Sequence, residues 1–126
     1  MVFDANEFLK SVAQVKNFWL ASKQSPLRIE SYSDTRQIHF ISINPKTGLG
    51  TTIIVPSYDV EDAILNVNTV ISFYRAVEIL QEMNVGKNNP LLLRIVPSPE
   101  NKRQFSLQVS LPHLNFVATA EKGKDS

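Results

Sequence analysis

The sequence predicts a single α+β domain in which a strand–helix–three-strand unit occurs twice. Two helices would then pack against two mainly antiparallel sheets. The first observation is the stretch Asp62–Met83, whose apolar residues cannot share one face of a single long helix. Alternation up to Val67 is typical of a strand, whereas spacing of three and four residues from Val70 is typical of a helix. Asn68 lies at the joint, where its side chain can cap the first helical turn.

The second observation is that the first residues of the chain follow the same plan. Asn6 takes the place of Asn68, and Phe8 takes that of Val70. Prolines also recur at matching borders of the expected elements, as the pairs Pro26 and Pro90, and Pro45 and Pro112. We therefore predict one domain over residues 1–126. It consists of pseudo-repeats over residues 1–56 and 60–120, followed by a polar tail over residues 121–126.

In the first repeat we expect a strand at Val2–Ala5 and a helix at Glu7–Leu20. Asp4 competes with Asn6 as the cap of this helix. The apolar stripe of the helix comprises Phe8, Val12, Val15 and Trp19. Three strands follow, the first two joined by a short turn at Asp34–Thr35: Leu27–Ser33, Arg36–Ile43 and Leu49–Val55.

In the second repeat a strand ending at Val67 precedes a helix that starts near Val70. The apolar stripe of this helix comprises Val70, Phe73, Tyr74, Val77 and Leu80. The remaining apolar runs predict three strands, of which the second alternates strictly: Leu91–Val96, Phe105–Leu111 and Leu114–Ala120.

Composition limits the functional classes. The chain has 126 residues, 43% of them apolar and 20% charged, as is ordinary for one globular domain. A formal net charge of +1 gives no general basic field, so a polyanion would have to meet a local patch. The absence of cysteine excludes disulfides and thiolate sites. We expect a cytoplasmic location (the host cytoplasm if the source is viral), because the sequence shows no signal peptide and no membrane-spanning apolar run.

Basic residues on or beside the predicted helices are candidates for non-specific contact with DNA phosphates: Lys10, Lys16, Lys23 and Arg75. The alternative is that these lysines form an ordinary solvated helix face. Glu78 and Glu82 follow Arg75 by about one and two helical turns, and both would repel phosphate.

Other candidate sites have plainer explanations. The acidic residues near the middle of the chain favour a connecting loop over a cation site: Asp59, Glu61 and Asp62. His39 and His113 are too few and too far apart in sequence to indicate catalysis, so we predict a protein that is not an enzyme and has no cofactor and no metal. Trp19 and Tyr32 could stack on bases, but Trp19 shares the apolar stripe of its helix, which favours core packing.

Three segments carry a resemblance to a known family. They read DANEFLKSV at Asp4–Val12, PSYDVEDAILNVN at Pro56–Asn68 and HLNFVATAE at His113–Glu121. Together with the repeated unit they resemble one domain of a DNA sliding clamp, most of all the C-terminal domain of phage-type clamps. The resemblance implies a processivity factor in DNA replication, with helices lining duplex DNA inside a ring. It also implies DNA polymerase and a clamp loader as partners.

Two other functions remain open on the sequence. The chain could be a small protein that binds single-stranded nucleic acid, or a structural oligomer that has the clamp fold and does not bind DNA. In the clamp and oligomer readings the chain associates with itself, edge to edge. Leu49–Val55 and the strand after Pro112 lack edge-blocking charges, so we expect the contact at these strands.

Overall fold

In the computed structural model of this chain, the described residues are 1–21, 24–44, 46–59, 61–67, 69–83, 91–97, 104–109 and 115–122. The helices are α1 (Ala5–Gln14), α2 (Lys16–Ala21) and α3 (Val70–Met83). The strands are β1 (Val2–Asp4), β2 (Leu27–Tyr32), β3 (Gln37–Ile43), β4 (Gly50–Pro56), β5 (Ala63–Val67), β6 (Leu92–Pro97), β7 (Gln104–Val109) and β8 (Asn115–Lys122). All neighbouring strands pair antiparallel, which confirms the predicted α+β class with antiparallel sheets.

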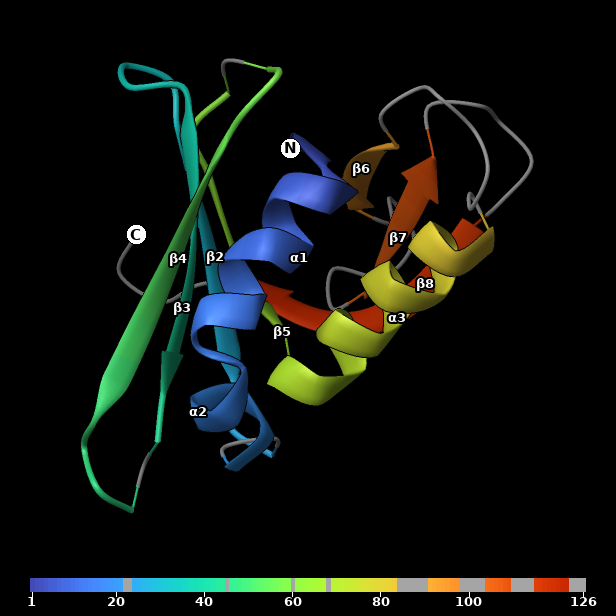
Figure 1. Cartoon of the computed structure of the whole chain (residues 1–126). Coiled ribbons are helices and arrows are strands. Elements are labelled where there is room, and N and C mark those ends of the chain that lie inside the picture. The colour runs from blue at the N-terminus through green and yellow to red at the C-terminus, as the bar shows by residue number, and fades with distance from the viewer. Residues whose placement is uncertain are drawn as a thin grey trace.

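The strands follow the order β1-β6-β7-β8-β5-β2-β3-β4 across the sheet. Each half of the chain therefore gives its first strand to the three strands of the other half. β1 pairs with β6, and β5 pairs with β2. The two four-stranded parts join where the end of β8 pairs with β5. The helices lie together on one side of the curved sheet (Figure 1).

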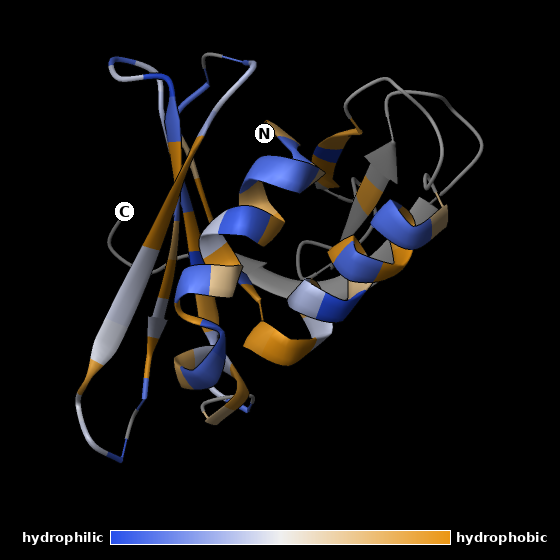
Figure 2. Ribbon diagram, viewed as in Figure 1, coloured by the Kyte–Doolittle hydropathy of each residue, from blue (hydrophilic) through white to orange (hydrophobic). Residues whose placement is uncertain are grey.

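One aromatic core receives side chains from both halves. Phe3, Phe8, Phe40 and Phe73 are each at most 1% exposed. The ring of Phe8 lies 4.8 Å from that of Phe40 and 5.5 Å from that of Phe73, both in edge-on geometry. Full burial of one such side chain contributes about 1.5–3 kcal/mol. Figure 2 shows the resulting alternation of hydrophilic and hydrophobic residues along α1 and α3.

The predicted change from strand to helix is confirmed, since β5 ends at Val67 and α3 begins at Val70. The buried stripe of α3 consists of Val70, Phe73, Ala76, Val77 and Leu80. The predicted cap, Asn68, lies outside the described residues. The capping hydrogen bond that the structure shows comes from the next residue: the Thr69 hydroxyl accepts the backbone N–H of Ser72 at 3.3 Å.

The prediction of one helix over Glu7–Leu20 is wrong, because the chain breaks into α1 and α2 at Val15. The backbone angles of Val15 are φ −124° and ψ 20°, and its N–H bonds to the carbonyl of Val12 at 2.9 Å. After this break the Trp19 ring packs edge-on against Phe8 at 5.9 Å. At the start of α1, Asp4 is the cap, since its carboxylate accepts the N–H of Asn6 at 2.8 Å.

The β2–β3 hairpin is confirmed, and its turn holds Arg36 at φ 54°. The C-terminal strand differs from its prediction in two ways. β8 extends to Lys122, and Glu121 and Lys122 pair with β5, so these two residues belong to a strand and not to the polar tail. β8 also lies between β7 and β5, so the prediction of an open edge after Pro112 is wrong.

Candidate nucleic-acid interface

The side of the molecule formed by the three helices is where the predicted DNA contacts would lie. α1 and α3 run side by side in opposite directions. Near one end, the Gln81 side-chain amide donates to the side-chain oxygen of Asn6 at 2.6 Å. Near the other end, Val12 and Trp19 meet the first turn of α3. The prediction that the two long helices are adjacent on one side is therefore confirmed.

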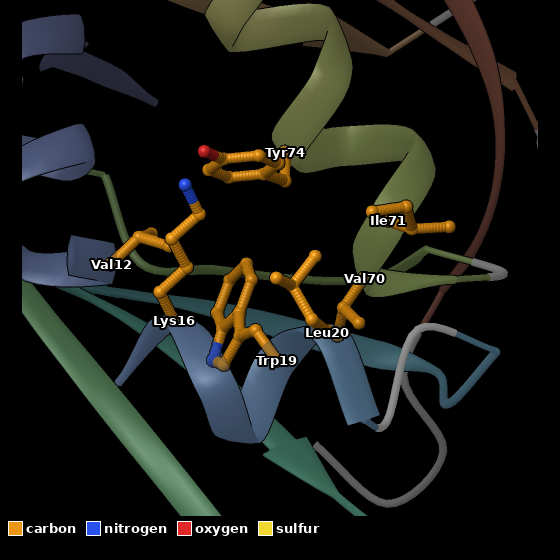
Figure 3. A pocket seen from close by; sticks show the side chains of 7 residues that line it. All are labelled: Val12, Lys16, Trp19, Leu20, Val70, Ile71 and Tyr74. Atoms are coloured by element: carbon orange, nitrogen blue, oxygen red, sulfur yellow. The ribbon is translucent and has the colours of Figure 1, made fainter. Parts of the chain in front are cut away.

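A narrow slot marks the second of these ends, between α2 and the start of α3. Figure 3 shows its lining residues, Val12, Lys16, Trp19, Leu20, Val70, Ile71 and Tyr74. Its volume of about 10 Å³ leaves room for roughly one water molecule. The Lys16 side chain extends toward Tyr74 (Figure 3). The slot is thus the boundary along which α2 packs against α3, and the charged end of Lys16 lies at its opening (Figure 3).

Tyr74 links this slot to the acidic part of α3. Its hydroxyl donates to the Glu78 carboxylate at 2.8 Å. Burial raises the pKa of Tyr74, and the hydrogen bond to Glu78 raises it further, because ionisation would place two negative charges together. The carboxylate of Glu78 therefore has a partner within its own helix.

The predicted phosphate contacts Lys10, Lys16 and Arg75 are all exposed, while Lys23 lies outside the described residues. Across α1, α2 and α3 the charged residues are three cations and three carboxylates: Lys10, Lys16, Arg75, Glu7, Glu78 and Glu82. The three helices therefore carry no net charge. Lys16 lies at the slot, whereas Glu7 and Glu82 are the sequence neighbours of Asn6 and Gln81 at the other end of the helix pair.

A second polar cluster lies on the opposite face of the sheet. Alternation along β2 places Arg28, Glu30 and Tyr32 on this outer face, and the Arg28 guanidinium donates to the Glu30 carboxylate at 2.8 Å. The Tyr32 hydroxyl donates to the other carboxylate oxygen, and this bond is the main cause that holds the pKa of Glu30 below its ordinary value. The same bond raises the pKa of Tyr32.

The His39 ring, on the neighbouring strand, lies 4.7 Å from that of Tyr32 and contacts the side chain of Gln37 at 3.3 Å. We did not predict this cluster. Its signal in the sequence is the i, i+2, i+4 spacing of Arg28, Glu30 and Tyr32, but only the pairing of β2 with β3 places His39 beside them.

The structure places the remaining predicted candidates in separate contacts. Asp62 accepts the backbone N–H of Ser33 at 2.6 Å, which lowers the pKa of this carboxyl. Asp59 instead contacts Ser57 and, at 3.0 Å, the amino group of Met1. Among the described residues, no three side chains of metal-binding type lie close enough together to hold an ion. Trp19 is 3% exposed, which confirms core packing, and His113 lies outside the described residues.

Comparison of the chain with models of protein families, with curated proteins and with solved structures found no match. Within the part of the chain that the structure describes, no helix has the length and apolarity needed to cross a membrane.

Proposed function

We propose that this chain is a non-enzymatic, clamp-like processivity factor in DNA replication, or one component of a ring around duplex DNA. The observation that best supports this function is the exchange of first strands between the two halves, with α1 and α3 side by side. The resemblance to clamp domains implies two helices side by side under two sheets, and the strand exchange makes the two units of this chain equivalent. Several copies joined through their sheets would present the helices to a central channel.

In this proposal Lys10 and Lys16 contact DNA phosphates without reading the base sequence. Both side chains are exposed, and they extend from the helices that would line the channel. Phosphate contacts of this kind hold a protein on DNA and let it slide, because no base edge is bound. The carboxylates of α3 make the second half of the domain the weaker contributor.

The proposal is tested by binding to duplexes of unrelated sequence at two salt concentrations. With two phosphate contacts per chain, raising the salt from about 50 to about 200 mM should weaken binding about tenfold. The double variant Lys10→Glu/Lys16→Glu should abolish binding and keep the fold. A matched double variant, Arg36→Glu/Lys46→Glu, changes the net charge equally at exposed turns away from the helices and should still bind. Equal loss in both variants, or none in either, would overturn the assigned interface.

A structural oligomer without DNA binding is the second candidate. The balance of charges across α1, α2 and α3 favours it, because a DNA-lining surface is normally basic. This candidate predicts self-association with no salt-dependent affinity for duplex DNA. Binding to single-stranded nucleic acid has less support, since Trp19 is buried and Tyr32 adjoins a carboxylate.

A further inference from the structure

The two ends of the sheet are not equally closed. β1 has only three residues, and the carbonyl of Val2 accepts the backbone N–H of Tyr58 at 2.9 Å. β4 is the last strand at the other end, and it has seven residues. Among the described residues, none pairs with the outer side of β4 between Gly50 and Pro56. Tyr58, whose N–H is bonded to Val2, lies two residues beyond the end of β4 on that side.

The register identifies the backbone groups that are open on β4. Hydrogen bonds from Asn44 to Leu49 and from Ser57 to Arg36, both 2.8 Å, fix the two ends of the β3–β4 ladder. Because bonded and non-bonded pairs alternate in an antiparallel ladder, the N–H and C=O groups of alternate β4 residues point away from β3. These residues are Gly50, Thr52 and Ile54. Pro56 belongs to the same series. An N–H at this position would point away from β3, so the proline removes no hydrogen bond from the β3–β4 ladder.

Between Gly50 and Ile54 this edge carries none of the usual devices that prevent pairing between molecules, and Pro56 lies beyond that segment. No charged residue occurs between Lys46 and Asp59. Of the seven large apolar side chains that are exposed in the described part, three lie at this edge: Ile43 at 53%, Leu49 at 64% and Ile54 at 48%. Most of β4 is white to orange in Figure 2, as expected for a strand without charges.

We propose that β4 pairs antiparallel with β4 of a second copy of this chain, with Thr52 opposite Thr52. In this register Gly50 of each copy lies opposite Ile54 of the other. All three open N–H groups of each strand then meet an open carbonyl, which makes six hydrogen bonds across the twofold axis. The hydrogen-bonding pattern of the edge is thus complementary to itself, and that is the reason for choosing a second copy as the partner.

The side chains fit the same register. On the outer face, Ile54 faces the gap left by Gly50 of the other copy, beyond which lies Ile43. On the inner face, exposed Leu49 lies opposite Val55 of the other copy. An open groove of about 470 Å³ between residues 13–18 and the start of β4 leaves room for side chains on this inner face.

The pairing joins two sheets into one and keeps both sets of helices on the same side. The contact is twofold and uses the open edge of each copy, so it gives a dimer, and a ring would need a second contact elsewhere on the chain. It rests on the edge of β4 and does not require DNA. A failure of the DNA-binding test would therefore leave the dimer intact. A failure of the dimer would leave the phosphate contacts testable.

Sedimentation across a range of concentrations tests the dimer. The wild-type chain should show a reversible monomer–dimer equilibrium. Thr52→Lys places two ammonium groups opposite each other at the axis and should weaken the dimer about tenfold or more. Ile79→Lys, at a side chain that is 54% exposed on α3, is the matched control and should leave the equilibrium unchanged. A monomer at every concentration, or a dimer that Thr52→Lys leaves intact, would overturn the proposal.

A covalent test keeps the proposal falsifiable if the lysine variant fails to fold. The chain has no cysteine, so Thr52→Cys introduces the only thiol. Directly opposite residues in a bonded antiparallel pair have Cα atoms about 5.5 Å apart, within reach of a short thiol crosslinker. Thr52→Cys should give a covalent dimer many times faster than Ile79→Cys. Equal crosslinking of the two variants would contradict the proposed register.

Discussion

The two halves of the chain have the same order of strand, helix and three strands, but their helices differ. In the first half the helical segment is interrupted at Val15 and carries two lysines and one glutamate. In the second half α3 is continuous and carries one arginine and two glutamates. The halves therefore differ in the continuity of their helices and in the charges that these helices present to solvent. Because surface substitutions usually change stability little, this solvent side is free to differ in function.

Substitutions in the shared core should have the largest effect on stability. Phe8→Ala and Phe73→Ala each remove a buried ring from the same aromatic cluster, so each should lower the free energy of unfolding by about 3–5 kcal/mol. Chemical denaturation measures both changes. Ile79→Ala, at an exposed position on α3, should stay within about 0.5 kcal/mol of wild type.

A double-mutant cycle tests whether the two halves share this core. The milder variants Phe8→Leu and Phe73→Leu keep the chain folded, and the rings they replace lie 5.5 Å apart. Residues in contact show coupling energies of about 0.5–3 kcal/mol. Additive effects would mean that each half has its own core.

The sequence predicted an element correctly where the pattern of apolar residues was local. The change of period between Val67 and Val70 predicted the β5–α3 joint, and alternation predicted the strands of the first half. The break at Val15 has no local signal, since neither glycine nor proline stands there. The break accompanies a tertiary contact that the local pattern does not show, the packing of Trp19 on Phe8.

Tertiary contacts also explain what the sequence did not predict, both in the sheet and at the candidate site. The pairing of β8 with β5 depends on residues more than fifty positions apart, so no local pattern indicated that Glu121 and Lys122 belong to a strand. Exposure of Lys10, Lys16 and Arg75 followed from helical periodicity. Helical periodicity did not predict how the charges of α1 and α3 lie relative to each other, because that placement depends on the antiparallel arrangement of the two helices.

The capping hydrogen bonds of α1 and α3 should also differ in how much they contribute to stability. Asp4 is 9% exposed, and its carboxylate accepts the Asn6 N–H at 2.8 Å, whereas the Thr69 hydroxyl accepts the Ser72 N–H at 3.3 Å. Asp4→Ala should therefore cost about 1–2 kcal/mol and Thr69→Ala about 0.5–1 kcal/mol in thermal or chemical unfolding. Asp4→Asn keeps an acceptor and should recover most of the loss. A larger effect at Thr69 would reverse this ranking.

A pH-dependent difference is expected on the outer face of the first half. The folded-state pKa of Glu30 lies below its ordinary value of 4.5, so its contribution is present above that pH and is lost as the pH falls through the lowered pKa. Glu30→Gln should cost about 0.5–1 kcal/mol at pH 7 and almost nothing relative to wild type at the acid end. Urea unfolding at several pH values measures this convergence. Arg94→Gln, at an exposed position of β6 with no ion pair among the described residues, is the control and should show no such trend.

The smallest expected effect concerns the contact that joins the two helices directly. Asn6 accepts a hydrogen bond from Gln81 at 2.6 Å, so this residue connects the halves and does not cap α1. A net contribution of about 0.5–1 kcal/mol is ordinary for such a bond, and partial exposure places this one near the lower limit. Asn6→Ala and Gln81→Ala should therefore each lower the free energy of unfolding by about 0.5 kcal/mol. Because each substitution already removes the bond, the double variant should cost little more than either single one. If the two effects add, the bond contributes nothing to stability, and the halves are held together by the aromatic core and by the strand pairings between them.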